Sequence, residues 1–382
     1  MDVVWLKLDL GIEGVEAEVV DSNLMVVSRR KLKTLSSAVL NGGLQRASSI
    51  INHQVSKDFN HSNPEEYLVK VVTSLKLPEP TVGFMTAADV KRFGFSKLTV
   101  NDVSVAVLVT AGLSNAVAAG EASMGGLGTI NTVVLVDADL TDGCMVEAVK
   151  TAIEAKCVAL TDLDVRSRVG RLATGTTTDA LAIACTERGK RFKYCGTGTE
   201  LGLTIARTVR EATIKAVEAQ EGLTPNRPLV KRLEERGINV EQLVKAGMEL
   251  YVHHPSMGSV KTAEETLKQF LEEALSDVNI AALILAASRI EDDGYRGLIP
   301  GLPAQTFSKD PVHLLADEIL GMAIADYIAG SKGIFEYVRF DRVKPGIIGR
   351  MGPFMDDALA ALIAGASSNM YSKLLKEALK KR

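Results

Sequence analysis

The first half of the chain alternates short apolar runs with Gly-rich or polar connections, a pattern typical of buried strands. Runs rich in Val and Ile predict strands within 3–28 and over 81–88, 103–112, 130–139 and 179–187. Apolar residues at helical spacing predict helices over 64–77, 140–156 and 200–220. No element is predicted in the polar stretch 41–63, where His53 and His61 are expected in a loop or on the surface. The pattern favours an α/β or α+β sheet domain.

The second half has helical period almost throughout. It follows a connector, EGLTPNRP (221–228), which contains Gly, Asn and two Pro. Helices are predicted over 229–237, 240–252, 260–276, 279–294, 313–330 and 353–382. The sequence therefore predicts two domains: the N-terminal sheet domain over 1–222 and a C-terminal all-α helical bundle over 229–382.

Composition narrows the class of protein. With 46% hydrophobic and 24% charged residues, the chain has enough apolar side chains for packed cores, and disorder is not expected. A net charge of -3 argues against a dedicated nucleic-acid binder. The four Cys show no CxxC spacing and are expected to be reduced apolar fillers.

Other features of the sequence bear on the cellular location and the oligomeric state of the protein. The start of the chain lacks the charged and apolar regions of a signal peptide. The longest apolar run, 278–287, is about half of the roughly 20 residues that a membrane-spanning helix needs. We therefore expect a cytoplasmic protein without a membrane span, and a homo-oligomer is compatible with the sequence.

Candidate chemistry in the first half lies in polar clusters at the ends of the predicted strands. Gly and small hydroxyl residues there allow a ligand to approach the backbone closely. Such loops at one sheet edge would form a pocket lined by Ser114, Asn115, Thr129, Asn131, Thr174, Thr176 and Asp179. The cluster ATGTTTD (173–179) suits either a phosphate cradle or a pocket that attacks or orients a carbonyl. GTGTELG (196–202) opens a helix with Thr199 as N-cap, and its spacing is not the dinucleotide fingerprint.

Several of these segments resemble the adenosylcobinamide amidohydrolase family, in that family's order and over about the first 220 residues. They are SSAVLNGG (36–43), VTAGLSNA (109–116), GTINTVVLVDADLT (128–141), EAK (154–156), ATGTTTDA (173–180) and GTGTELG (196–202). The resemblance implies hydrolysis of the amide that joins an aminopropanol arm to the corrin ring, which gives adenosylcobyric acid in corrinoid salvage. Thr177 stands where the family usually has Gly.

Amide hydrolysis needs a nucleophile or activated water, oxyanion donors and an acid for the leaving amine. Asp179 is the expected orienting group or base, and Lys156, at the end of the predicted helix and near Glu154, is a second base or proton donor. The candidate nucleophiles are Ser114, Thr174 and Thr176, and the candidate oxyanion donors are Asn115 and Asn131. In the alternative interpretation, the Thr and Asp side chains satisfy turn backbone and Lys156 is an exposed cation.

Candidate chemistry in the second half consists of carboxylates. His313 and Asp317 are expected on one helix face with Glu318 beside them, and Asp356 and Asp357 fall in the first turns of a later helix. Acid pairs on two packed helices suit Mg²⁺, and a basic loop between them, EYVRFDRVKPG (336–346), offers Lys344 and an Arg for phosphate oxygens. The alternative is that acids at a helix start stabilise the helix dipole.

Three segments resemble the phosphatidylglycerophosphatase A family: ADEILGM (316–322), FEYVRFDRVKPG (335–346) and MDDALAALIAG (355–365). The resemblance implies a Mg²⁺ site with ligands drawn from Asp317, Glu318, Asp341, Asp356 and Asp357, and substrate contacts from Arg339 and Lys344. This family includes a soluble branch that resembles α-ribazole phosphate phosphatase.

Together, the two resemblances predict a bifunctional corrinoid-salvage hydrolase. Its expected ligands are a corrinoid and a phosphorylated nucleoside-like small molecule. Two alternatives stay open: a phosphatidylglycerophosphate phosphatase with an accessory domain, and a corrinoid-binding module that does not cleave its ligand.

Overall fold

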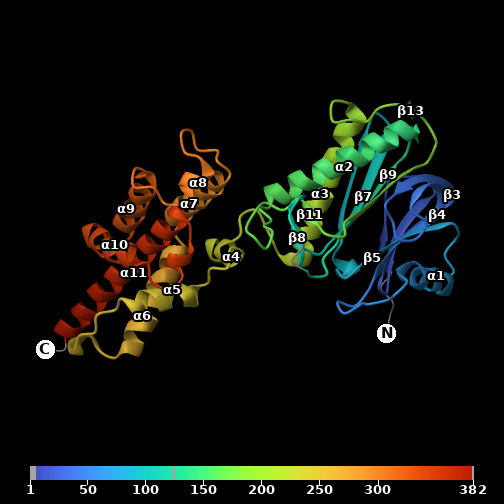
Figure 1. The fold of residues 1–382 in the computed structure, drawn as a ribbon. Helices are drawn as coiled ribbons and strands as arrows, with labels where there is room; N and C mark the ends of the chain where they lie inside the picture. Colours follow the sequence, from blue (N-terminus) through green and yellow to red (C-terminus); the bar gives the residue numbers. More distant parts are fainter. Residues whose placement is uncertain (1–5, 123–124, 381–382) are drawn as a thin grey trace. The chain divides into compact units, whose positions relative to one another are not determined.

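The computed structural model describes residues 6–122 and 125–380 and divides the chain into two compact units, Met1–Asn226 and Arg227–Arg382 (Figure 1). Each unit has its own hydrophobic core. We refer to them as the N-terminal and C-terminal units.

The N-terminal unit is built on a mixed sheet. Its strands are β1 (Leu6–Leu8), β2 (Val15–Val20), β3 (Asn23–Ser36), β4 (Gly43–Gln54), β5 (Thr81–Thr86), β6 (Gly94–Val100), β7 (Val103–Ala111), β9 (Ile130–Val136) and β12 (Ala180–Cys185). They follow the order β1-β2-β3-β12-β9-β7-β6, while β4 pairs with β3 and β5. The pairs β12–β9 and β4–β5 are parallel and the others antiparallel. Two short pairs, β8 (Ala116–Val117) with β11 (Gly175–Thr176) and β10 (Asp139–Leu140) with β13 (Arg191–Phe192), lie outside this sheet.

The long strand β3 organises this sheet. A bulge between Val27 and Leu32 interrupts its pairing with β4. On its other edge, β2 pairs with the first part of β3 and β12 with the last part. β3 thus joins the antiparallel β1–β2 edge to the central strands β12, β9 and β7.

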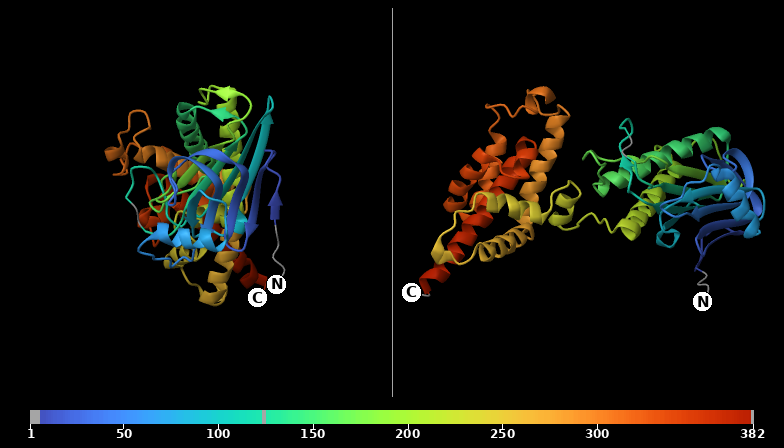
Figure 2. Two further views of the ribbon diagram at one scale, coloured as in Figure 1. Left: turned by 90° about the vertical axis from the view of Figure 1, so that its right-hand side faces the viewer. Right: turned by 60° about the horizontal axis from the view of Figure 1, so that its bottom comes forward.

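The central strands bury side chains on both faces, with helices covering one face and other strands of the sheet covering the opposite face. Val105, Val107 and Val109 of β7 pack with α2 (Asp142–Asp162) and α3 (Glu200–Glu221), whereas Ala106 and Leu108 face the core formed with β2, β3 and β4. α1 (Pro64–Ser74) packs beside β4 and β5 (Figures 1 and 2).

The C-terminal unit is a helical bundle, as predicted. Its helices are α4 (Leu229–Glu234), α5 (Val240–Glu249), α6 (Val260–Leu275), α7 (Val278–Tyr295), α8 (Ala304–Phe307), α9 (Ala316–Ala329), α10 (Ser331–Val343) and α11 (Pro353–Lys380). α11 runs through the middle of the bundle and is buried from Pro353 to Ser368 (Figures 1 and 2). α5, α6, α7, α9 and α10 all pack against it. A Cβ at Gly365 would lie 2.6 Å from Ile328, so this glycine allows α9 to approach closely.

Two strands of the main sheet, β4 and β6, were not predicted. β4 was missed because its Ser and Asn side chains obscure the pattern, yet Ala47–Asn52 are buried between β3 and β5. In consequence His53 is a half-buried strand residue rather than a loop residue, and its ring nitrogens bond Asn23 and Tyr67. β6 was missed as well, and its pairing with β7 and its contact with α3 explain the extended conformation.

Three helix boundaries also differ from the prediction. α2 continues to Asp162, so Lys156 lies inside the helix and not at its end. The segment expected as a basic loop is helix α10, whose Gly333, Tyr337 and Phe340 are buried at helical spacing. α9 begins at Ala316, so the helical pairing of His313 with Asp317 is wrong. The predicted elements at 3–5 and 381–382 lie outside the described residues.

Two features bear on the class of protein. Within the described residues, no helix combines the length and the apolar character required to cross a membrane. All four Cys are free, and Cys144, Cys185 and Cys195 are buried, as expected for apolar fillers.

Candidate active sites

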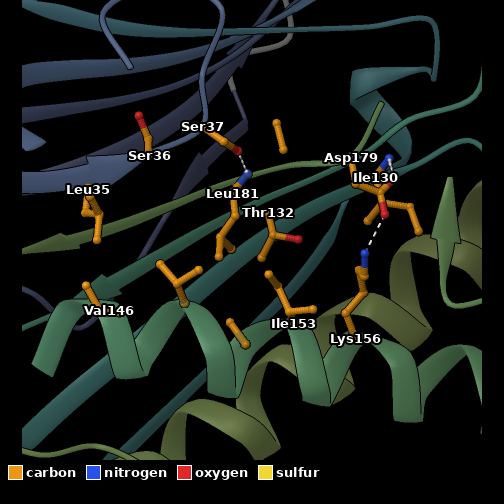
Figure 3. Close-up of a pocket in the computed structure, with 13 residues that line it drawn as sticks. Leu35, Ser36, Ser37, Ile130, Thr132, Val146, Ile153, Lys156, Asp179 and Leu181 are labelled. Carbon is orange, nitrogen blue, oxygen red and sulfur yellow. Dashed lines mark hydrogen bonds and ion pairs between the residues drawn. The ribbon is translucent and has the colours of Figure 1, made fainter. Parts of the chain in front are cut away.

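A pocket of about 390 Å³ lies between α2 and the sheet of the N-terminal unit (Figure 3). Its walls are largely apolar: Val146, Val149, Ala152 and Ile153 come from α2, and Leu35, Ile130, Ala180 and Leu181 from the strands. Polar groups are few, namely Ser36, Ser37, Thr132, Lys156 and Asp179. An apolar cleft with a few placed polar groups is the usual form of a small-molecule site. We call it the α2 pocket.

Asp179 directly precedes β12, and its carboxylate accepts hydrogen bonds from four donors. One carboxylate oxygen accepts hydrogen bonds from the backbone N–H groups of Ile130 (3.0 Å) and Thr176 (3.1 Å) and from the Thr176 hydroxyl. The other accepts from Lys156 Nζ at 2.5 Å. The side chains of Lys156 and Asp179 are 13% and 17% exposed, so the ion pair is shielded but open to the pocket. With three donors on Oδ1 and Lys156 on Oδ2, the Asp179 carboxylate is held in a position suited to orienting Lys156.

Gly175 makes room for this ion pair. A Cβ there would lie 2.2 Å from Asp179 Oδ2 and 2.7 Å from Lys156 Nζ, closer than side chains pack. The glycine in ATGTTTD is therefore required by the Lys156–Asp179 pair.

The structure does not bring the other predicted catalytic residues into the α2 pocket. Ser114 is exposed, and its carbonyl accepts a hydrogen bond from Arg168. The Thr174 hydroxyl accepts from the Ala119 N–H at 2.9 Å. Glu154 lies on the exposed side of α2. Thr176 reaches the site only through Asp179.

Asn115, Thr129 and Asn131 lie around the same strand ends but do not line the α2 pocket. Asn115 is buried and donates to the Thr177 hydroxyl at 2.6 Å. Thr129 and Asn131 line a different pocket on the opposite face of the sheet. The polar clusters thus gather at one sheet edge, but their side chains divide between its two faces.

Carboxylates converge inside the C-terminal unit. Glu318 of α9, Asp341 of α10 and Asp357 of α11 each offer an oxygen within 4.8 Å of the others. Tyr337 holds two of them, with its hydroxyl 2.7 Å from Asp357 Oδ1 and 3.0 Å from Glu318 Oε2. Burial, reinforced by the charges of Asp356, Glu318 and Asp341, raises the pKa of Asp357 to about 8. Crowded, desolvated carboxylates of this kind favour a bound cation.

Lys344 lies next to this cluster. It adopts a left-handed conformation (φ 47°) at the end of α10, and its ammonium is 2.6 Å from Asp356, 3.3 Å from Asp310 and 3.9 Å from Asp341. Burial raises the pKa of Asp356 to about 6 against the opposing effect of Lys344. The second Asp356 oxygen is buried and has no partner among the described residues.

Two predicted residues stand apart from the acid cluster. Arg339 pairs with Glu336 at 2.7 Å and donates to the Leu250 carbonyl, away from the three carboxylates. Asp317 is buried, and its oxygen accepts from the Glu318 N–H at the start of α9. Burial raises the pKa of Asp317.

Sequence reasoning missed several residues of both sites. Ser36, Ser37 and Thr132 line the α2 pocket, and the first two belong to a segment that was used only for its family resemblance. Tyr337 was passed over because its segment was expected to be a loop, and nothing in the sequence placed its hydroxyl between Glu318 and Asp357. Glu291, which accepts from the Met355 N–H at 2.9 Å at the start of α11, gave no signal either.

Comparisons with known proteins match two families, one in each unit of the chain. Residues 11–225 match the family model of adenosylcobinamide amidohydrolase, and residues 298–372 match that of phosphatidylglycerophosphatase A. The chain is 30% identical over 192 residues to the adenosylcobinamide amidohydrolase of Methanosarcina mazei, across 48% of this chain and 87% of that protein. It is 37% identical over 130 residues to an uncharacterized protein of Methanocaldococcus jannaschii, across 33% of this chain and 98% of that protein.

Among solved structures, the low temperature requirement C protein of Listeria monocytogenes is similar with a TM-score of 0.34 and 24% identity. The similarity covers 38% of this chain and 93% of that one.

The family matches define a hydrolase with an amidohydrolase region followed by a phosphatase-like region. The chain belongs to the adenosylcobinamide amidohydrolase family.

Proposed function

We propose that the N-terminal unit hydrolyses adenosylcobinamide to adenosylcobyric acid and 1-aminopropan-2-ol, and that the C-terminal unit removes phosphate from α-ribazole phosphate with Mg²⁺. The observation that supports the first activity best is the Lys156–Asp179 pair at the side of an apolar pocket. For the second it is the convergence of carboxylates from α9, α10 and α11.

Amide cleavage in the α2 pocket would depend mainly on Lys156. Its ammonium carries three protons, and Asp179 engages one of them. The others can donate to the amide oxygen as negative charge develops there, and can protonate the leaving nitrogen. Water adds its oxygen to the carbonyl carbon, the C–N bond breaks, and the proton from water replaces the one that Lys156 gives to the amine.

The remaining pocket groups would bind the substrate. The apolar α2 side chains exclude water and pack against the apolar parts of the corrinoid. The Ser36 hydroxyl is buried and has no partner among the described residues, so it is available to a substrate amide.

In the C-terminal unit, Glu318, Asp341 and Asp357 have the oxygen chemistry and the spacing that suit Mg²⁺. The unpartnered Asp356 oxygen beside them adds a further donor. Mg²⁺ there would polarise a phosphoryl oxygen. Lys344 would neutralise phosphate charge, with Asp310 and Asp356 fixing its position. Tyr337 would hold Glu318 and Asp357 in place.

The amidohydrolase assignment is tested with Lys156→Met in the full chain. We expect kcat for adenosylcobinamide to fall by about 100-fold or more, because the leaving amine loses its proton donor. Lys150→Met is the matched control, since Lys150 is exposed on the same helix. Product is measured as released 1-aminopropan-2-ol. A folded Lys156→Met protein with unchanged kcat would remove Lys156 from the mechanism.

The phosphatase assignment is tested by offering the protein α-ribazole phosphate and phosphatidylglycerophosphate in parallel, with Mg²⁺ and with a chelator. We expect Mg²⁺-dependent phosphate release from the first ester. Preferential hydrolysis of the lipid would show that the proposed substrate is wrong, and turnover in the chelator would contradict the role of the metal.

A further inference from the structure

A second pocket of the N-terminal unit, of about 240 Å³, lies on the sheet face opposite the α2 pocket. The two pockets meet at the same strand ends, because successive residues of β9 and β12 face opposite sides of the sheet. Asp179 lines the α2 pocket and Thr178 lines the second pocket, while Ala180 lines both. In β9, Thr132 faces the first and Asn131 the second. We call the second one the β5 pocket, since Phe84, Met85 and Thr86 belong to its wall.

A buried acceptor lacks a partner in the β5 pocket. Asn131 is 2% exposed, and its Nδ2 donates to Asn52 Oδ1 (2.9 Å) and to the Met85 carbonyl (2.8 Å). Asn52 is itself fixed, because its amide nitrogen donates to the Thr110 hydroxyl. These bonds set the orientation of the Asn131 amide and leave its buried Oδ1 without a partner among the described residues, in a side chain that lines the pocket. A buried acceptor left without a donor is unfavourable.

The rim of the pocket adds a second acceptor. The Thr178 hydroxyl donates to the Gly128 carbonyl at 2.9 Å. The Thr129 hydroxyl, 2.7 Å away, must therefore donate its proton to Thr178, which leaves its own lone pairs for a ligand. Around these acceptors the pocket is apolar, with the rings of Phe59 and Phe84 and the side chain of Leu127.

We propose that the β5 pocket binds a second part of the corrinoid substrate: an N–H donor carried on an apolar or aromatic body. This inference rests on the amide hydrolysis proposed for the α2 pocket. Two groups of adenosylcobinamide have this chemistry, the amino-substituted purine of its adenosyl group and the primary carboxamides on the rim of its corrin ring. The substrate would lie across the ends of β9 and β12, anchored on one sheet face and cleaved on the other.

The test fills the β5 pocket without touching the α2 pocket. Leu127→Trp introduces bulk at a side chain that is 51% exposed, and Thr129→Val removes the rim acceptor with little change in volume. The control is Val69→Trp on α1, at a residue that is 46% exposed and lines neither pocket. Binding of adenosylcobinamide, cyanocobinamide and 5′-deoxyadenosine to the full chain is measured by equilibrium dialysis, alongside KM and kcat for amide cleavage.

We expect Leu127→Trp and Thr129→Val to weaken adenosylcobinamide binding by about 5-fold or more, in line with the loss of at least one hydrogen bond, and to raise KM more than they lower kcat. If the purine is the donor, 5′-deoxyadenosine binds the wild type and not Leu127→Trp. If a carboxamide is the donor, both corrinoids weaken equally. If Leu127→Trp and Thr129→Val bound adenosylcobinamide as tightly as the control Val69→Trp, the proposal would be overturned. A wild type that binds corrinoid at this pocket without cleaving it would refute the proposed amidohydrolase activity alone.

Discussion

At the scale of single residues, the N-terminal site depends on Gly175 as much as on the charged groups. The ion pair of Lys156 and Asp179 lies directly over the Gly175 backbone. Two backbone N–H groups, from Ile130 and Thr176, donate to the other carboxylate oxygen of Asp179. The geometry of the site is therefore set by backbone approach and not only by side-chain choice.

This dependence gives a first prediction. Gly175→Ala places a Cβ against Asp179 and Lys156, so we expect loss of most amide-cleaving activity and a free energy of unfolding lower by about 1–3 kcal/mol. Activity and urea denaturation are the measurements. Gly143→Ala is the matched control, because nothing lies within 4 Å of a Cβ at that helical position. Equal behaviour of the two variants would show that the close approach at Gly175 has no consequence.

Part of this site could be predicted from the sequence, and the rest could not, because it depends on tertiary packing. Asp179 could be predicted because a carboxylate among several Thr residues at a strand end is chemically unusual. Its pairing with Lys156 could not, because that contact depends on where α2 packs against the sheet. Asn131 and Thr132 are consecutive strand residues and therefore face opposite sides of the sheet. That each side holds a pocket could not be predicted, because this depends on which elements cover each face.

At the scale of elements, three helices assemble the C-terminal site. α9, α10 and α11 each contribute one carboxylate, and the N-terminal turn of α11 is anchored from α7 by Glu291. The acid pairs of α9 and α11 could be identified from the sequence. α10 was expected as a loop, because its many charged residues mask the helical spacing of its few buried positions. With α10 helical, Asp341 joins the cluster and Arg339 turns away from it.

Glu291 predicts how stability depends on pH. Burial raises its pKa to about 7, above the ordinary value of 4.5. The folded state thus holds this proton more tightly than the unfolded state, and the resulting stability is present below about pH 4.5 and lost as the pH rises through 7. In Mg²⁺-free buffer, the wild type should lose stability between pH 5 and 8. Glu291→Gln should lose about 1–3 kcal/mol less over that range.

Urea denaturation of both proteins at the two pH values measures this difference. The Gln side chain can still accept the Met355 N–H, so the anchor of α11 is retained in the variant. Identical pH dependence in the two proteins would contradict the burial of an ionisable group at this position.

At the scale of the whole molecule, two units have separate cores and match two different enzyme families. The two-domain organisation followed from the change of hydrophobic period near the connector, because helical and strand periods differ along the chain. We expect residues 227–382 expressed alone to unfold cooperatively and to keep phosphatase activity within about 3-fold of the full chain. Calorimetry and phosphate release are the measurements, and an aggregated or inactive fragment would contradict independent folding.

The central claim, two independent hydrolytic sites in one chain, is tested most directly by assaying both activities in two full-length variants. Asp179→Asn should lower adenosylcobinamide cleavage by about 100-fold or more and leave phosphate release from α-ribazole phosphate unchanged. Asp357→Asn should do the reverse. The account would be contradicted if either folded variant lost both activities, or if both variants kept both activities.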